Sequence, residues 1–223
     1  MYLPFIVPAG FGFLGSFGGI TRLKGFLPDR DALLKFGTAG PFYGSSVSLG
    51  LFFIGMVLSS LGVTDIGIDT PAFTDSLLVA VSAQAFLGDQ LLDPLIQVNS
   101  LMLAGWAGLV VNALACIPAG ETDGGRIATA IWGRRGGTAL GIWSVGLLTI
   151  TSLSSALSFL WLVLVLVTQR GPVLPCRQEI TDPRDEAAIQ RGLVMLGLPL
   201  LVLLPYPAEL IRAFQDLANP AFL

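Results

Sequence analysis

The sequence contains no histidine among its 223 residues. Histidine is the side chain most often used as a general base near neutral pH, and it is the commonest metal ligand in proteins. Its absence excludes any imidazole-based site within these residues, including both histidines of an HExxH zinc motif. Acid–base catalysis or metal binding by imidazole therefore cannot arise from this sequence alone.

Cysteines and charged residues are also scarce. The two cysteines, Cys116 and Cys176, are too few to define a zinc site, and we interpret them as a buried small residue and a loop thiol. Only 12% of the residues are charged, against about 25% in soluble domains, whereas 53% are hydrophobic. The net charge of -3 does not indicate nucleic-acid binding. The first residues lack the basic stretch of a signal or transit peptide.

Long apolar runs dominate what is present. Several approach the roughly 20 residues that cross a bilayer as a helix. They are continuous rather than alternating, which favours helices over a membrane barrel. The sequence therefore predicts an all-α polytopic membrane protein, a single membrane domain over residues 1–223 with about five transmembrane helices. The expected spans are residues 40–62, 98–118, 138–154, 155–169 and 192–206.

Two segments are not expected to cross the membrane. Residues 2–37 open with prolines and glycines among aromatic and β-branched residues, which favours short strands and loops at the membrane surface. Residues 72–87 are apolar but interrupted by polar side chains, and they are predicted as an amphipathic or half-inserted helix. Gly40, Gly44 and Ser48 form small-xxx-small pairs, which favour close helix packing.

The basic residues predict the orientation of the chain. If residues 72–87 do not cross, segments 21–37, 124–137 and 170–191 lie on one side and hold eleven of the twelve lysines and arginines. Membrane proteins carry an excess of these residues in their cytoplasmic loops. The three segments are therefore expected to face the cytosol, stroma or matrix together.

Two charged groups flank the predicted spans. Arg134 and Arg135 are interpreted as stop-transfer charges, with a site for an anionic lipid as the functional alternative. Four carboxylates on the opposite side are expected to form a solvated acidic rim: Asp65, Asp69, Asp89 and Asp93.

One acidic residue, Asp123, lies in a glycine-rich turn between apolar segments, within PAGETDGGR. Pro118 is expected to end or kink the preceding helix. Three glycines permit backbone conformations closed to other residues: Gly120, Gly124 and Gly125. A carboxylate at the mouth of a helical bundle needs a partner, water or a metal. Asp123 could pair with Arg126 or bind a divalent ion, although one carboxylate is too few ligands for zinc.

Residues 104–135, AGWAGLVVNALACIPAGETDGGRIATAIWGRR, resemble the second signature of the site-2 proteases, which are intramembrane zinc metalloproteases, and most closely their plastid EGY branch. Further segments fit the same branch: residues 15–44, FLGD at 86–89, QRGPVLP at 169–175 and EITDP at 179–183. The resemblance covers nearly all of the chain. It implies a site-2 protease-like core in a thylakoid or other plastid membrane, zinc-dependent cleavage of substrate helices, and surface strands that hold substrate by β-augmentation.

The resemblance makes Asp123 the third zinc ligand, beside two histidines from an HExxH helix that would precede this N-terminus. The matching motif residues are Pro118, Gly120, Asp123, Gly124, Gly125 and Arg126. The sequence departs from the family in three ways. It has no HExxH, the motif asparagine aligns with Ala115, and the motif leucine aligns with Thr122. Asn112, one turn earlier, is a neighbour of the motif asparagine and not its replacement.

These departures favour a catalytically inactive relative. No catalytic or cofactor-binding residue is assigned, and Asp123 is expected to be a vestigial zinc ligand, hydrated or paired with Arg126. The protein would be a structural, assembly or binding subunit of a thylakoid or inner-envelope complex, for instance a photosynthetic one, among membrane lipids and other membrane subunits. The alternative is an active zinc protease whose HExxH helix lies upstream of Met1. A transporter-like bundle is disfavoured, because the spans carry almost no charge.

Overall fold

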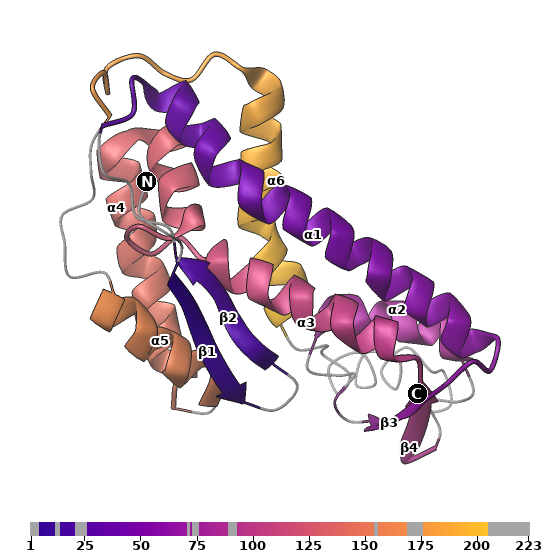
Figure 1. Cartoon of the computed structure of the whole chain (residues 1–223). Coiled ribbons are helices and arrows are strands. Elements are labelled where there is room, and N and C mark those ends of the chain that lie inside the picture. The colour runs from indigo at the N-terminus through magenta and orange to yellow at the C-terminus, as the bar shows by residue number, and fades with distance from the viewer. Residues whose placement is uncertain are drawn as a thin grey trace, which may run out of the picture. The chain divides into compact units, whose positions relative to one another are not determined.

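The computed structural model describes residues 5–11, 14–20, 26–70, 72, 76–88, 93–153, 156–168 and 176–204 (Figure 1). Most of these residues are helical, in agreement with the predicted class. The contacts divide the chain into two compact units, where the sequence predicts one membrane domain. The first unit is Met1–Val47 with Ala107–Pro199, and the second is Ser48–Trp106 with Leu200–Leu223.

The first unit begins with an antiparallel hairpin of β1 (Phe5–Phe11) and β2 (Leu14–Ile20). Its register is irregular around Pro8, which has no N–H to donate to the ladder. The strands predicted in this region are therefore present. Their place at a membrane surface stays a prediction.

Helix α1 (Arg30–Ser60) begins at residue 30, whereas the predicted span begins at residue 40. Residues 30–37 are thus helical and not part of a surface loop. The carboxylate of Asp29 starts the helix by accepting a hydrogen bond from the N–H of Ala32 at 2.8 Å. The glycines and proline of FGTAGP disfavour a helix when considered alone. In the folded protein, Gly37 lets α1 pack closely against Ile127, since a Cβ on Gly37 would lie 3.3 Å from the Ile127 side chain.

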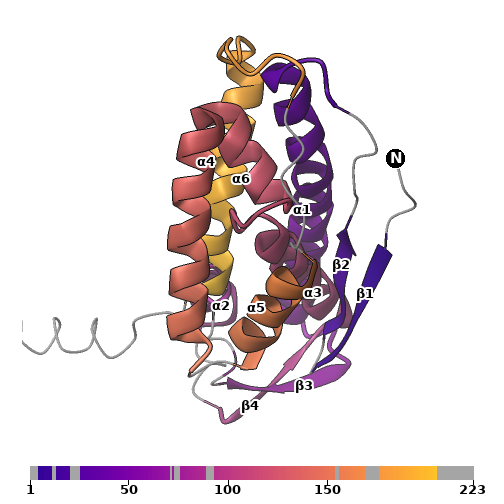
Figure 2. The same ribbon diagram turned by 90° about the vertical axis from the view of Figure 1, so that its left-hand side faces the viewer.

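Helix α4 (Asp123–Thr151) consists of two legs joined at a sharp break. Gly133 has a φ of 70° and a ψ of -178°, a backbone conformation that favours glycine. Beyond the break, a Cβ on Gly137 would collide with the backbone and side chain of Thr129. The second leg, residues 134–151, therefore runs back past the first as a tight hairpin, which Figure 2 shows with its tip at the upper end.

The first leg of α4 corrects a prediction. The sequence predicts residues 124–137 as a water-facing segment ahead of a span at 138–154. Residues 124–128 are instead buried, as is Ala130. Ile127, Ala128 and Ala130 supply an apolar surface for the interior of the unit, and within residues 124–137 only Trp132, Arg134 and Arg135 are exposed.

Arg30 stabilises the break in α4 through hydrogen bonds. A helix that ends leaves its last carbonyl groups without partners. The buried guanidinium of Arg30 donates to the carbonyls of Ala130 at 2.8 Å and Ile131 at 2.7 Å, and it also donates to the carboxylate of Asp182 at 2.6 Å. The start of α1, the tip of α4 and the loop around Asp182 thus meet at one end of the first unit. The charge pattern of the sequence places the same three segments on one side.

Helices α5 (Ala156–Thr168) and α6 (Glu186–Leu203) complete the described part of this unit. The predicted break at residues 154–155 lies outside the described residues, as does the predicted end of the last span after residue 204. Helix α6 begins before its predicted start at residue 192 and continues through Pro199. It is the only described helix besides α1 that contains a proline.

The second unit contains a second antiparallel hairpin, formed by β3 (Ile66–Asp69) and β4 (Leu95–Val98). Ile66 lies opposite Val98, and Asp69 lies opposite Leu95. The sequence analysis does not predict this hairpin. The signal for it is the alternation in β4, where Ile96 and Val98 are buried between exposed neighbours.

Helix α2 (Leu77–Leu87) occupies most of the segment predicted as amphipathic. The hydroxyl of Ser76 caps it by accepting from the N–H of Val79. At 11 residues it extends about 16 Å, which is too short to cross a bilayer. Its exposed side includes Val81 and Phe86, so both sides of the helix are largely apolar and the amphipathic form of the prediction does not hold.

Helix α3 (Ser100–Ala115) packs closely against α1. In the second unit, a Cβ on Gly55 would collide with the backbone of Met102. In the first unit, a Cβ on Gly44 would lie 3.1 Å from the amide carbon of Asn112. Gly44 therefore has the close contact predicted for it. Gly40 has no atom within 4 Å, so it has no such contact.

Two described helices, α1 and α6, are long and apolar enough to cross a membrane by length and composition. Helices α2 and α3 and residues 158–167 of α5 are apolar but shorter. The 16 residues of α3 extend about 24 Å, somewhat less than the roughly 30 Å of a bilayer core. Five spans stays a prediction, of which the described residues support two.

Candidate functional site

The hydroxyl of Thr122 closes the turn that carries Asp123. It accepts hydrogen bonds from the N–H groups of Ala119 at 3.2 Å and Gly125 at 3.1 Å. It also donates to the carbonyl of Ile117 at 2.7 Å. Thr122 is the N-cap of α4. The residue that departs from the family motif therefore holds the turn together, a role that leucine could not fill.

Two glycines bring this turn against α4. A Cβ on Gly124 would collide with the carbonyl of Cys116, and one on Gly125 would collide with the carbonyl of Gly120. The sequence predicts backbone freedom at all three glycines, but only Gly120 has a positive φ, of 59°. Gly124 and Gly125 are required for the close approach instead. Pro118 lies just after the end of α3, in the turn that leads into α4.

We expect Thr122→Val to lower the free energy of unfolding by about 1–2 kcal/mol, the usual effect of losing a helix N-cap. Valine has nearly the shape of threonine but leaves two N–H donors and one carbonyl without the hydroxyl. Urea unfolding in detergent micelles measures the difference. Thr122→Ser keeps the hydroxyl and is the control. Equal stability of the serine and valine variants would contradict this role.

Asp123 forms an ion pair with Arg126. The Nη1 atom of Arg126 lies 3.3 Å from Oδ1 of Asp123, and the two side chains are 5% and 27% exposed, respectively. The guanidinium also lies over the ring of Phe36, 5.4 Å from its centroid. A Cβ on Gly37 would lie 3.3 Å from the carbonyl of Asp123, so α1 covers one side of the pair. The sequence leaves open whether Asp123 pairs with Arg126 or binds a divalent ion. In the structure it pairs with Arg126.

Burial dominates the electrostatics of Asp123. It raises the pKa of this carboxyl to about 6, although the charge and hydrogen bond of Arg126 act in the opposite direction. The folded protein therefore binds this proton more tightly than the unfolded chain does. With a pKa of about 6 the carboxyl is still mostly ionised at neutral pH, where Arg126 balances its charge.

We expect the folded protein to become more stable as the pH falls from about 7 towards 4, by about 2 kcal/mol. The reason is that between the folded pKa of about 6 and the unfolded value near 4, the folded state holds the proton and the unfolded state has lost it. The chain has no histidine to add its own titration in this interval. Denaturant midpoints in micelles at several pH values measure the effect. Asp123→Asn should flatten the profile, and a slope that survives in this variant would assign the effect to other groups.

The residues around Asp123 do not fit a zinc ion on their own. Catalytic zinc usually has three protein ligands. Within the part of the chain that the structure describes, no group of three or more His, Cys, Asp or Glu side chains could hold a metal. Asp123 offers one carboxylate, and the guanidinium of Arg126 already uses it. Its role as a third ligand stays a prediction that needs donors from outside this sequence.

The other departure from the family motif, Ala115, is half-buried at the end of α3 and offers no polar group. The side-chain amide of Asn112 donates to the carbonyl of Gly108 within α3 at 2.8 Å and lies against Gly44 of α1. Asn112 is thus used in packing between two helices. The structure does not show it in the role of the motif asparagine.

A polar cavity of about 220 Å³ lies elsewhere in the first unit, between the start of α1 and the loop before α6. Its lining residues are Asp29, Arg30, Asp31, Gln178, Thr181, Asp182 and Arg184. Arg30 forms an ion pair with Asp182 at 2.6 Å, and the carboxylate of Asp31 accepts a hydrogen bond from the backbone N–H of Arg184 at 2.9 Å. The Nζ atom of Lys35 lies 3.0 Å from Asp185, and the hydrogen bond between them lowers the pKa of that carboxyl. The loop is thereby fastened to α1.

The chain is similar to curated plant proteins. It is 43% identical over 206 residues to the probable zinc metalloprotease EGY2, chloroplastic, of Arabidopsis thaliana, which covers 92% of this chain and 36% of the relative. It is 34% identical over 210 residues to the corresponding EGY1 of Oryza sativa subsp. japonica, over 92% of this chain and 35% of the relative. The chain therefore spans just over a third of the length of these relatives.

A third relative is the DDT domain-containing protein PTM of Arabidopsis thaliana, 33% identical over 158 residues, which cover 69% of this chain and 9% of that protein. No family model matches the chain, and no solved structure matches it. The similarity to EGY2 and EGY1 extends over nearly the whole chain. The chain belongs to the EGY branch of the site-2 protease family.

Proposed function

We propose that this chain is a catalytically inactive member of the EGY branch, embedded in a plastid membrane, where it serves as a structural, assembly or binding subunit of a larger complex. The observation that carries the proposal is the Asp123–Arg126 pair. The carboxylate that would be the third zinc ligand in the family is bound to a buried guanidinium in a turn held by Thr122. Protein groups alone form the contacts that hold this turn.

The supporting features lie in the sequence and in the relatives. The 223 residues contain no histidine, and the two motif positions occupied by Ala115 and Thr122 depart from the protease pattern. The EGY relatives are named chloroplastic, and the apolar helices α1 and α6 suit a membrane, which together support a plastid membrane location. Within the plastid, we favour the thylakoid over the inner envelope.

Metal analysis and a cleavage assay test the inactivity. The full chain is purified in detergent without chelators, its zinc content is measured, and it is incubated with a membrane-spanning substrate helix. We expect far less than one zinc per chain and no cleavage that a chelator stops. About one zinc per chain that is lost in Asp123→Ala, or chelator-sensitive cleavage, would overturn the proposal. A transcript with an in-frame HExxH helix upstream of Met1 would favour the active protease instead.

The five-span arrangement makes a separate prediction about topology. A tag inserted within residues 88–95 should be accessible from the side opposite to a tag within residues 178–186, because three predicted spans, 98–118, 138–154 and 155–169, lie between them. Protease protection of each tag in sealed vesicles measures this. The contact of Arg30 with Ala130 and Asp182 supports a shared side for the three basic segments. Tags on the same side would contradict an odd number of spans between residues 95 and 178.

A further inference from the structure

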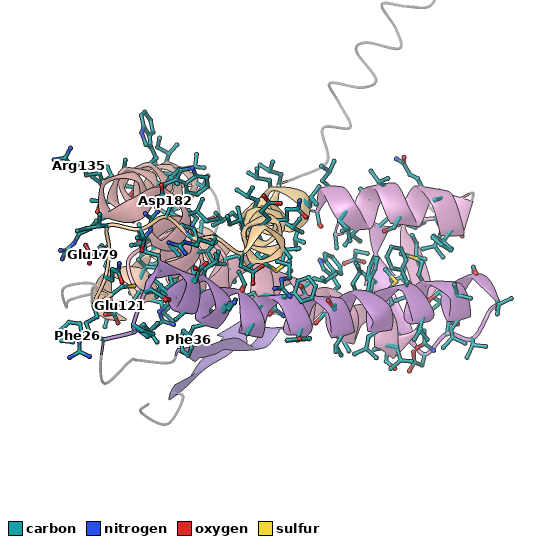
Figure 3. All side chains as sticks on the ribbon, turned by 90° about the horizontal axis from the view of Figure 1, so that it is seen from above. Phe26, Phe36, Glu121, Arg135, Glu179 and Asp182 are labelled. Atoms are coloured by element: carbon teal, nitrogen blue, oxygen red, sulfur yellow. The ribbon has the colours of Figure 1, made fainter. Side chains whose placement is uncertain are left out.

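The tip of the α4 hairpin, residues 132–135, is a fixed cationic surface, which we call the α4 tip. Gly133 turns the chain there, and Arg134 and Arg135 are exposed beside it. Trp132 is 47% exposed. Figure 3 shows the side chain of Arg135 extending outward from the hairpin. The tip is rigid, because the guanidinium of Arg30 binds the carbonyls just before it.

Among the described residues, the arginines of the α4 tip, Arg134 and Arg135, form no ion pair. Residues 124–178 contain no aspartate or glutamate at all. The exposed arginines of the following loop differ in this respect, because Arg177 and Arg184 are close in sequence to several carboxylates. The α4 tip therefore offers two guanidinium groups to an external anion.

The second leg of α4 suggests where that anion lies. Large apolar side chains of this leg and of the turn after it are exposed: Ile142, Trp143, Leu147, Ile150 and Leu153. Such a surface marks a membrane or protein interface. From Arg135 to Thr151 the leg extends about 24 Å, close to the thickness of a bilayer core. With the leg in the hydrocarbon, the α4 tip is at the level of the headgroups, where tryptophan is also enriched.

We propose that the α4 tip binds the anionic headgroups of membrane lipids. Each guanidinium can donate paired hydrogen bonds to a phosphate or sulfonate, which suits arginine better than lysine. The inference rests on the membrane location proposed above and is independent of whether the chain cleaves proteins. We favour lipid over an acidic protein segment because the charged tip is continuous with the exposed apolar second leg of α4. An acidic segment could pair with the arginines, but it would leave that apolar surface uncovered.

Lipid titration of the purified full chain tests this. Native mass spectrometry follows the binding of phosphatidylglycerol and of phosphatidylcholine to delipidated protein in neutral detergent. Each basic residue near an anionic surface contributes about fivefold in affinity, so we expect phosphatidylglycerol to bind at least about tenfold more tightly. Arg134→Gln with Arg135→Gln should abolish this preference. Arg177→Gln with Arg184→Gln removes the same charge from the loop and should keep it.

Several results would overturn the inference. They are equal binding of both lipids by the unaltered chain, an unchanged preference after substitution of the α4 tip, and equal losses in both double variants. Displacement of phosphatidylglycerol by inorganic phosphate would show a general anion site instead. Circular dichroism verifies that the variants fold. Flotation with neutral vesicles separates the two proposals: a chain that fails to float contradicts the membrane location, whereas one that floats without lipid preference contradicts only this inference.

Discussion

Replacing Gly124 with alanine is expected to lower the free energy of unfolding by about 3 kcal/mol, at the upper end of the usual effect of overpacking. The added Cβ would collide with the carbonyl of Cys116 and approach the backbone of Ile117. These are backbone atoms of the turn that carries Asp123, so no side-chain rotation relieves the clash. Urea unfolding in detergent micelles, followed by tryptophan fluorescence, measures the loss.

Gly146→Ala is the matched control for Gly124→Ala, because both glycines lie in α4. A Cβ on Gly146 meets no atom within 4 Å. Alanine there should leave stability unchanged or raise it by about 0.5–1 kcal/mol, the usual difference between alanine and glycine within a helix. If the two variants were equally stable, the turn could not lie against the first leg of α4 as described.

The second large effect is expected at Arg30. Arg30→Met should lower the free energy of unfolding by about 3 kcal/mol, because two carbonyls near the break in α4 lose a charged, buried donor. Methionine keeps much of the length and apolar volume of the arginine stem, so the loss reports mainly on hydrogen bonding. The same unfolding assay applies. Limited proteolysis should also cut the loop around Asp182 faster, since that loop loses its contact with α1.

Lys35→Met is the control for Arg30→Met. It removes a positive charge that also joins α1 to the loop before α6, through Asp185. This pair is largely exposed, and exposed ion pairs contribute little to stability, so we expect almost no change. A large loss in Lys35→Met, or none in Arg30→Met, would mean that the loop is held by total charge and not by the cap on α4.

These effects have a consequence for function. The turn at Asp123 is fixed by close backbone contacts at Gly124 and Gly125 and by the hydroxyl of Thr122. Such a turn keeps its shape whether or not a metal is bound nearby. A family member can therefore lose the metal site and still retain the turn as part of its packing, which is consistent with the proposed role as a subunit.

The sequence predicted most helices and the local chemistry at Asp123. Apolar runs indicated α1, α3, α5 and α6, because a helix that meets lipid or a dry interior must be apolar over its length. The spacing of three residues between Asp123 and Arg126 made Arg126 one candidate partner, since residues three apart share one face of a helix, and the structure shows this pair. Both kinds of inference rest on interactions between residues close in sequence.

The features that the sequence analysis missed depend on residues far apart. Nothing near Arg30 indicates that it binds Ala130, one hundred residues away. The break at Gly133 is likewise invisible in WGRRGG, which also suits a surface loop. The start of α1 was misplaced because glycine and proline at 37–41 disfavour a helix locally, whereas packing against the first leg of α4 makes that helix favourable.

By itself, the sequence determined that this is a largely helical chain of the EGY branch, with its basic residues gathered in three segments and one carboxylate in a glycine-rich turn. Composition, periodicity and short-range spacing carry the helical class and the charge pattern, whereas the family follows from the resemblance of segments such as residues 104–135. Only the tertiary structure decided that α4 folds back on itself, that Arg30 caps the break, and that Thr122 and two glycines lock Asp123 beside Arg126. Those outcomes depend on close contacts and buried hydrogen bonds between distant segments, whose energies appear only when the segments are brought together.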